Sequence, residues 1–324
     1  MLELLGLPFD KGGRTRGSRL GPAAIRLAGL IPAMAELGHP ISDLGDFSVP
    51  ETDTPAGGWR EFDEAFPSYQ LAQQKVAQVL ARGNTPLVLA GSHDVALGTV
   101  SAALRHLQGD LAVLWIDAHA DLNTPATSPS GNLHGTPLAA LLGLAPGSAP
   151  NQKWLDQWQQ LVDLAGPHHL ESHRVAWLGL RSVDPGESRH MAQLPGCLPL
   201  TMQNIDQHGI PKLIEGIRRW VEASGTRNLW VSFDLDSLDP IYAPGTGTTV
   251  RGGLTYREGH MIAELLSKML RDVNLVGLDV VEVNPTLDQF NLTATMATEW
   301  ICSLFGKRIL GGWEPDLTPW LSGQ

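Results

Sequence analysis

Several features that would place the chain in a specialised class of protein are scarce or absent. Only two of the 324 residues are cysteines, Cys197 and Cys302, and they lie far apart and outside any CxxC pair. This excludes a disulfide framework and a thiolate metal site. No apolar run reaches the roughly 18 residues that a membrane span needs, and the chain does not begin with a basic segment followed by a long apolar one. Secretion and membrane anchoring are therefore disfavoured, and we expect a reducing compartment, the cytoplasm.

Clustered positive charge is also missing. The formal net charge is -11 and the isoelectric point is near 5.4, with no block of Lys or Arg to offset the acidic residues. Nucleic acids and anionic membrane surfaces attract proteins through such blocks, so neither is expected as a partner. The length suits a single domain, residues 1–324, with a substantial core. We expect an enzyme that acts on a small molecule.

The most informative stretch is residues 113–121, an apolar run that ends in three potential metal ligands at alternate positions. Successive side chains of a β-strand point to opposite faces. Asp117, His119 and Asp121 would therefore emerge on one side, where the strand meets its loop. Alone, this pattern could also be a solvated strand end.

Two further strand ends supply more ligands. The apolar run 229–236 finishes with Asp234 and Asp236 at the same spacing, and the strand 85–90 opens into a glycine-lined turn that carries His93. Open α/β sheets place their sites at the carboxyl ends of strands. Together the three strand ends predict a metal site.

Strands alternate with helices along the chain. This order implies right-handed βαβ crossovers and an α/β domain with a largely parallel sheet of about eight strands. The predicted strands are 2–8, 41–47, 85–90, the run from 113, 174–180, 197–201, 228–233 and 274–281, and the predicted helices include 68–82, 210–222, 257–270 and 292–305.

The predicted ligand set is rich in oxygen. Four carboxylates and two imidazoles suit a harder divalent ion such as manganese. Six ligands are too many for one catalytic ion with an open position, so if Asp117 and Asp234 bridge, the set divides into two sites that share a water. Two cations would lower the pKa of that water and provide hydroxide, the nucleophile of metal-assisted hydrolysis. A single structural ion or a calcium loop is the alternative.

Motifs along nearly the whole chain resemble the ureohydrolases, the family of arginase and agmatinase, and are most similar to arginase. They are residues 6–9, 21–22, 117–121, 130–135, 183–187, 232–240, 253–259 and 282–285. The resemblance implies a three-layer, arginase-like fold and hydrolysis of L-arginine to L-ornithine and urea by a metal-bridging hydroxide. It also implies a guanidino substrate and a homo-oligomer, either a trimer or a hexamer.

The resemblance further assigns roles to individual residues. One manganese ion would be held by His93, Asp117, Asp121 and Asp234, and a second by Asp117, His119, Asp234 and Asp236. The catalytic residues would be Asp121, His134 as proton shuttle, and Glu282 as partner of the guanidinium group. Substrate would be bound by Asn123, Ser128 and Ser130 at the α-carboxylate, by Asp184 and Glu187 at the α-amino group, and by Thr248.

Two points leave alternatives open. The family usually reads Gly-Gly-Asp-His-Ser around its first histidine ligand, whereas this chain has Gly91-Ser-His-Asp94, so the partners of His93 should differ and nickel, cobalt or iron remain possible. The motif 243–248 is somewhat like that of agmatinases, so agmatine, guanidinobutyrate or guanidine are alternative substrates. A zinc deacylase of the same fold would use one metal instead of two.

Overall fold

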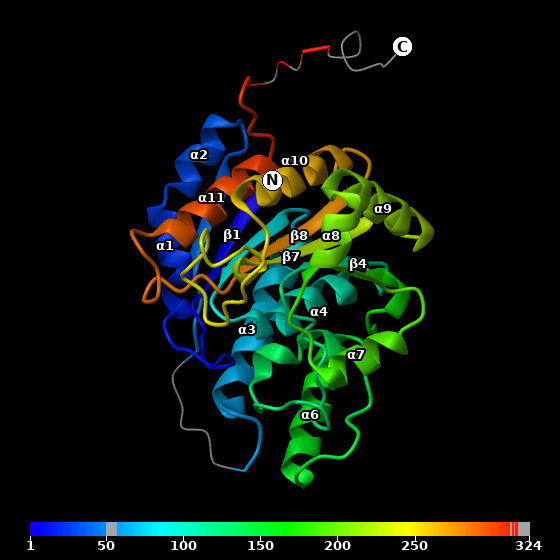
Figure 1. Cartoon of the computed structure of the whole chain (residues 1–324). Helices are drawn as coiled ribbons and strands as arrows, with labels where there is room; N and C mark the ends of the chain where they lie inside the picture. The colour runs from blue at the N-terminus through cyan, green and yellow to red at the C-terminus, as the bar shows by residue number, and fades with distance from the viewer. Residues whose placement is uncertain (50–56, 312, 314, 317–324) are drawn as a thin grey trace.

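The computed structural model describes residues 1–49, 57–311, 313 and 315–316. Within them, eight parallel strands form one sheet in the order β2-β1-β3-β8-β7-β4-β5-β6 (Figure 1). The strands are β1 (Leu2–Leu7), β2 (Ile41–Asp46), β3 (Thr85–Ala90), β4 (Ala112–Ile116), β5 (Val175–Leu180), β6 (Leu198–Thr201), β7 (Asn228–Asp234) and β8 (Asn274–Val281). The predicted α/β fold with a parallel sheet of about eight strands is confirmed.

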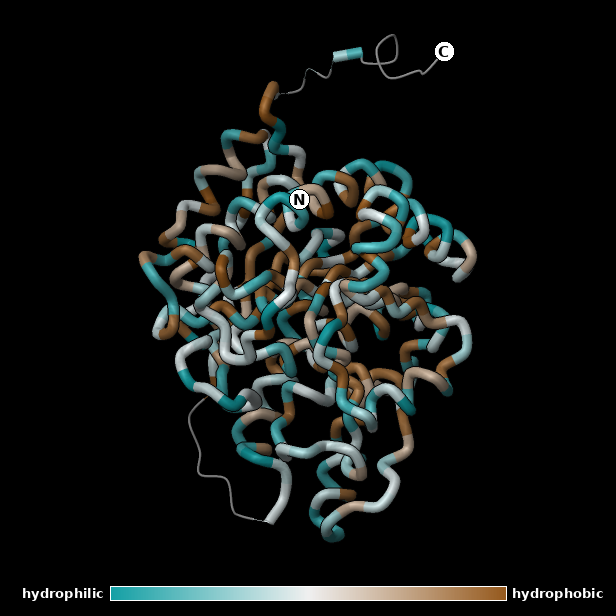
Figure 2. The backbone as a smooth tube through the Cα atoms, viewed as in Figure 1, coloured by the Kyte–Doolittle hydropathy of each residue, from teal (hydrophilic) through white to brown (hydrophobic). Residues whose placement is uncertain are grey.

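Helices cover both faces of the sheet and make three layers. One face packs against α1 (Gly21–Leu27), α2 (Leu30–Glu36), α8 (Met202–His208), α9 (Ile210–Ala223), α10 (Tyr256–Met269) and α11 (Leu292–Leu304). The other packs against α3 (Phe62–Ala81), α4 (Ala96–His106), α5 (Pro137–Leu141) and α6 (Gln152–Ala165), with α7 (Pro185–Ala192) beside them. Strands that are covered on both faces have continuous apolar sequences. In Figure 2 the hydrophobic stretches, coloured brown, accordingly gather in the interior of the molecule.

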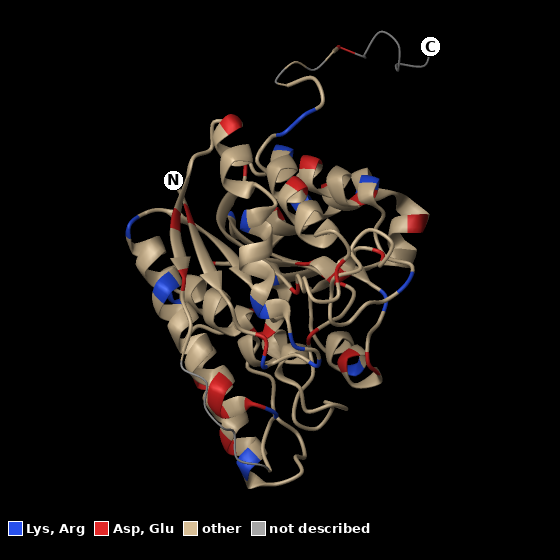
Figure 3. Cartoon of the chain, turned by 90° about the vertical axis from the view of Figure 1, so that its left-hand side faces the viewer, with Lys and Arg blue, Asp and Glu red and all other residues tan. Residues whose placement is uncertain are grey.

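The strand sequences reflect this burial. Every residue of β4 and β5 is buried, and neither strand alternates apolar with polar residues. The edge strand β2 is half exposed, and its Asp43 and Asp46 are paired with Arg26 of α1. Charged side chains on an edge strand discourage pairing with another chain. Basic and acidic residues are interspersed on the outer helices in Figure 3.

The helix boundaries differ from the predictions mainly at α3. This helix begins at Phe62, six residues before the predicted start at 68, with Asp63 and Glu64 in its first turn and Pro67 inside it. Acidic residues favour a helix N-terminus through the helix dipole, and the Glu64 carboxylate also pairs with Lys11 at 2.7 Å. Among the described residues, no helix is both long enough and apolar enough to cross a membrane.

The topology gathers the predicted ligands at one edge of the sheet. All neighbouring strands run in parallel, so their carboxyl ends meet at the same edge. The four central strands, β3, β8, β7 and β4, lead into His93, Glu282, Asp234 and Asp117. His93 and Glu282, which are 189 positions apart in sequence, are thereby brought together.

Candidate metal centre

A first group of ligand atoms surrounds His93, in the short 3-10 helix η2 (His93–Val95) after β3. Its Nδ1 lies 3.1 Å from Asp117 Oδ2, 3.3 Å from Asp121 Oδ2 and 3.2 Å from Asp234 Oδ2. His93, Asp117 and Asp121 are all buried, and their ligand atoms lie within 4.8 Å of one another. The structure thus brings together the four residues expected around the first ion.

A second group lies beside the first. His119 Nδ1 lies 3.0 Å from Asp236 Oδ2 and 3.4 Å from Asp117 Oδ1. Asp117 therefore presents one oxygen to each histidine, as a bridging carboxylate would. Asp234 presents Oδ2 to His93, whereas its Oδ1 accepts the backbone N–H of Asp236 at 2.7 Å. Of the two predicted bridges, Asp117 is the one that faces both histidines, with Oδ2 toward His93 and Oδ1 toward His119.

The His93 ring is oriented as a metal ligand would be. Its Nε2 lies 2.8 Å from Ser232 Oγ, and the ring stacks on Trp115 at a centroid distance of 3.9 Å. The buried Nδ1, although surrounded by carboxylate oxygens, has no hydrogen-bond partner in the described part of the chain. A metal-ligating histidine usually has its other ring nitrogen held by a hydrogen bond. The orphaned Nδ1 and its oxygen neighbours therefore fit a divalent cation.

The electrostatics of the carboxylates point the same way. Burial, followed by the charge of Asp117, raises the pKa of Asp121 to about 7. Burial and the charge of Asp236 raise the pKa of Asp234 well above its ordinary value, and burial with the charge of Asp117 raises that of Asp236. Buried carboxylates this close repel one another when ionised. Cations bound between them would remove that repulsion.

His134 and Glu282 lie beside these ligands. His134 is in the 3-10 helix η3 (Leu133–Gly135), and its Nδ1 lies 4.0 Å from Glu282 Oε1. The same Glu282 oxygen accepts the backbone N–H of His93 at 2.9 Å. Burial, with the positive charge of His119, lowers the pKa of His134 to about 4, and burial raises the pKa of Glu282 to about 8.

Two site carboxylates have unusual backbone conformations. Asp121 has a φ of 50° and Glu282 a φ of 64°, both in the left-handed region. Residues other than glycine adopt this region uncommonly, at a cost of order 1–3 kcal/mol, and such residues cluster at functional sites. Each follows directly on a strand or its loop, where the turn aims the carboxylate toward the cluster.

The ligands open into a cavity of about 140 Å³. Its wall contains His93, His119, Asp121, Asn123, Ser128, Ser130, His134, Asp184, Glu187, Asp234 and Thr248, as well as Pro129, Asn132, Gly135 and Ser182. Nearly all predicted site residues are therefore together. Asp117, Asp236 and Glu282 are buried outside this wall. Asn132, which lies inside the motif 130–135, and Ser182, which borders the motif 183–187, are additions to the predicted site residues.

The loop expected to bind the α-carboxylate is held by its own hydrogen bonds. Ser128 Oγ accepts the Gly131 N–H at 3.0 Å, and Ser130 Oγ accepts the Asn132 N–H at 3.2 Å. Both hydroxyl protons stay available to an anionic ligand. Asn123 Nδ2 donates to Asp184 Oδ2 at 3.1 Å, which joins this loop to α7.

Glu187 and Thr248 have structural partners of their own. The Glu187 carboxylate accepts the Leu122 N–H at 2.9 Å through Oε1 and the Asp184 N–H at 2.8 Å through Oε2. Burial raises the pKa of Glu187 to about 7. Thr248 Oγ1 donates to Asp236 Oδ2 at 2.8 Å. Both residues therefore support neighbouring site residues in addition to lining the cavity.

Asp94, one of the two residues that depart from the family pattern, is hydrogen-bonded to a partner other than the His93 ring. Asp94 accepts a hydrogen bond from the Tyr69 hydroxyl, and the ring of His93 is bonded to Ser232 instead. Burial raises the pKa of Asp94. The partner of the ring nitrogen is thus a serine on β7, 139 positions away, which no local motif could indicate.

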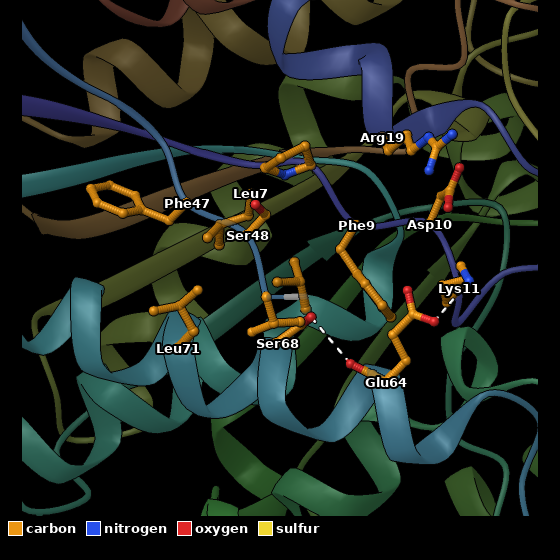
Figure 4. Close-up of a pocket in the computed structure, with 13 residues that line it drawn as sticks. Leu7, Phe9, Asp10, Lys11, Arg19, Phe47, Ser48, Glu64, Ser68 and Leu71 are labelled. Atoms are coloured by element: carbon orange, nitrogen blue, oxygen red, sulfur yellow. Dashed lines mark hydrogen bonds and ion pairs between the residues drawn. The ribbon is translucent and has the colours of Figure 1, made fainter. Parts of the chain in front are cut away.

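Other cavities lack such a cluster. One of about 280 Å³ lies between the loop after β1 and α3, where Lys11 and Glu64 form an ion pair (Figure 4). In the described residues both groups of potential metal ligands, His93/Asp117/Asp121 and Asp117/His119/Asp236, lie at the carboxyl edge of the sheet instead.

Comparison with known proteins identifies the lineage. The sequence model of the arginase family matches residues 2–306. The chain belongs to the arginase family. An arginase of Bacillus subtilis (strain 168) is 38% identical to it over 312 residues, covering 95% of this chain and 99% of that protein. A crystal structure of arginase from Bacillus subtilis superposes with a TM-score of 0.85 at 36% identity, covering 95% of this chain and 99% of that chain.

Other branches of this lineage are less similar. A crystal structure of a hypothetical agmatinase from Burkholderia thailandensis superposes with a TM-score of 0.70 at 25% identity, covering 94% of this chain and 84% of that chain. The resemblance to arginases expected from the motifs is confirmed for the family as a whole, and the comparison favours its arginase branch.

Proposed function

We propose that this member of the arginase family hydrolyses the guanidino group of L-arginine to L-ornithine and urea with two divalent cations. The observation that carries the proposal is the position of Asp117, which faces His93 with one oxygen and His119 with the other. A carboxylate between two ligand groups is what a binuclear centre requires. The greater similarity to arginases than to an agmatinase supports arginine as the substrate.

The cations would be held by the six predicted ligands. His93, Asp117, Asp121 and Asp234 would hold the first, and Asp117, His119, Asp234 and Asp236 the second. When bound, such a pair supplies Lewis acidity and lowers the pKa of a shared water. The oxygen-rich donor set favours Mn²⁺, with nickel, cobalt and iron as alternatives.

The remaining catalytic side chains handle protons and the guanidinium group. With its pKa lowered to about 4, His134 is neutral at pH 7 and can accept a proton and pass it to the leaving amine. We assign the pairing with the substrate guanidinium to the Glu282 carboxylate, whose Oε1 lies 4.0 Å from His134 Nδ1. The positive charge of the guanidinium would favour the ionised carboxylate. Asp121 both faces His93 and lines the cavity, so it is assigned a catalytic role as well as a ligand role.

The other end of the cavity suits an amino acid. Asn123, Ser128 and Ser130 offer amide and hydroxyl groups to the α-carboxylate, and Asp184 and Glu187 offer negative charge to the α-amino group. Thr248 lines the same cavity. Agmatine has no carboxylate, and guanidine has neither group, so each would leave some of these side chains unpaired.

Urea release tests the proposal. Purified chain loaded with Mn²⁺ should release urea from L-arginine with a much higher kcat/KM than from agmatine, guanidinobutyrate or free guanidine. A higher kcat/KM for agmatine would transfer the assignment to an agmatinase. Full activity with a single zinc ion per chain would instead indicate the one-metal chemistry of the deacylases.

We also propose that residues 1–324 form one catalytic domain, assembled as a trimer or hexamer in the cytoplasm. The continuous sheet supports one domain, and two unpaired cysteines, Cys197 and Cys302, suit a reducing compartment. Light scattering on the purified full chain should give three or six times the 34.9 kDa of one chain.

A further inference from the structure

Asp94 is a buried acid that the proposed reaction does not use. Its side chain is fully enclosed, and the hydroxyl of Tyr69 on α3 donates a hydrogen bond to its Oδ2. Tyr69 is itself fully buried, with its ring edge-on to Phe9 at a centroid distance of 6.0 Å. A buried carboxylate is costly unless it is hydrogen-bonded, so the phenol holds Asp94 in one place.

The same carboxylate lies against the backbone of Gly12. A Cβ atom on Gly12 would come within 1.8 Å of Asp94 Oδ2, which means that only the hydrogen atoms of glycine fit there. The carbonyl of Gly12 in turn accepts the backbone N–H of His134 at 3.1 Å. A short path of direct contacts therefore runs from Tyr69 through Asp94 and Gly12 to His134.

The loop that contains Gly12 is held at several points, including the bond from the Gly17 N–H to Asp10 Oδ2 at 2.7 Å and the bond from Arg16 to the Asp10 carbonyl at 3.2 Å, but Gly12 itself lies against Asp94. On its inner side the Phe9 carbonyl accepts the N–H of Ser92, two residues before Asp94, at 2.8 Å. On its outer side the described residues leave the cavity of about 280 Å³, where Lys11 is tied to Glu64 (Figure 4). Because a cavity lies on one side of this segment, the contact with Asp94 on the other side helps to set the position of Gly12.

We propose that Tyr69 and Asp94 are positioning residues that fix His134 through Gly12. The inference rests on the proposed function, because it assumes that His134 shuttles protons. A catalytic group displaced by about 1 Å can lose roughly 100-fold in rate. The pair acts on the proton-transfer step and does not touch the substrate. Asp94 directly follows the predicted ligand His93 in the chain, so metal content is measured together with kcat.

The test compares Tyr69→Phe with Tyr256→Phe in the Mn²⁺-loaded enzyme. Tyr256 is a matched control, since it is an exposed tyrosine whose hydroxyl bonds Glu299 on the surface. In Tyr69→Phe, kcat per folded, metal-loaded chain should fall roughly 10-fold or more, whereas KM and metal content stay within about twofold of the unmodified enzyme. Tyr256→Phe should change none of these.

A double variant separates positioning from plain stabilisation. Tyr69→Phe strands a buried carboxylate, and the additional change Asp94→Ser removes it, so the melting temperature should recover. The turnover number should stay low, because the contact with Gly12 is gone. A kcat in Tyr69→Phe equal to that of Tyr256→Phe, or a kcat that recovers together with stability in the double variant, would overturn the inference. Urea release by the unmodified enzyme is scored separately, so failure of the proposed function would be recognised as such.

Discussion

The hydroxyl of Thr248 donates to Asp236 Oδ2 at 2.8 Å, the same oxygen that faces His119 Nδ1 at 3.0 Å. Thr248 belongs to the loop that follows β7 and is not itself one of the predicted metal ligands. Its hydroxyl therefore helps to orient Asp236, a predicted ligand of the second cation. Such outer partners typically contribute 10- to 100-fold to metal affinity.

Replacing Thr248 should accordingly weaken the second cation more than the first. In Thr248→Val the affinity for the second Mn²⁺ should fall about 10-fold or more, with the first site nearly unchanged, as measured by calorimetric titration of metal-free protein. Thr295→Val is a suitable control, because that hydroxyl bonds only a helix carbonyl of α11. Equal loss at both sites would show that Thr248 has no selective role.

Asp234 and Asp184 should differ in what their loss removes. Asp234→Ala deletes an oxygen 3.2 Å from His93 and should abolish urea release and reduce bound metal. Asp184→Ala deletes a cavity wall group and should raise KM for arginine with metal content unchanged. Elemental analysis and steady-state kinetics on both variants decide the matter, and metal loss from the Asp184 variant would contradict the assignment.

The stability of the metal-free chain should fall as pH rises from 6.5 to 8. Burial raises the pKa of Glu282 to about 8 and those of Asp121 and Glu187 to about 7, so the folded chain keeps protons that the unfolded chain has already lost. Facing carboxylates raise the pKa of His119 to about 12 against the effect of burial, which adds to the same trend. The lowered pKa of His134, about 4, acts with opposite sign, and this effect fades as the pH rises past 6.5, the ordinary pKa of an unfolded histidine.

Each additional proton held by the folded state costs about 1.4 kcal/mol of unfolding free energy per pH unit. Urea denaturation in EDTA at the two pH values measures this change. Saturating Mn²⁺ displaces these protons and should flatten the dependence or reverse it. A metal-free chain that is more stable at pH 8 than at pH 6.5 would refute the burial of uncompensated carboxyl groups.

The substrate loop should discriminate arginine from agmatine through the carboxylate. A lost hydrogen bond to a charged group costs about 1.5–3 kcal/mol, or roughly 10- to 150-fold. The double variant Asn123→Ala/Ser130→Ala should therefore lower kcat/KM for arginine strongly and leave the small value for agmatine nearly unchanged. Ser172→Ala, which removes an exposed hydroxyl bonded to Pro195, is the control. An equal loss of kcat/KM for both substrates would show that Asn123 and Ser130 do not bind the α-carboxylate of arginine.

Much of the fold and of the metal cluster could be predicted because both follow from local periodicity. Apolar runs such as that from Val113 identify buried strands, and the ligands were expected where such strands end. β4 ends at Ile116, so Asp117, His119 and Asp121 lie in the segment after the strand, and the alternation of strand faces does not by itself account for their positions. Parallel pairing then brings Asp117 and Asp234 to one edge whatever the exact length of the intervening helices. The start of α3 at Phe62 was harder to predict, since a proline usually marks a helix boundary, whereas Pro67 lies inside this helix.

Contacts between distant loops could not be predicted. The bond between His93 and Ser232 joins a turn to the neighbouring strand β7, and the bond between Thr248 and Asp236 joins two segments that follow β7. Both depend on how the chain packs at the edge of the sheet, which no periodicity records. The exchange at Ser92 and Asp94 predicts a different environment for His93, but the direction in which Asp94 turns depends on Tyr69, a residue of another layer.

The central claim is that two cations bound around Asp117 make the chain an arginine hydrolase. The most direct measurement is a titration of metal-free protein with Mn²⁺ while urea release from L-arginine is recorded. The account predicts that activity rises to its plateau at two equivalents of Mn²⁺ per chain. A plateau at one equivalent, or no urea at any ratio, would contradict it.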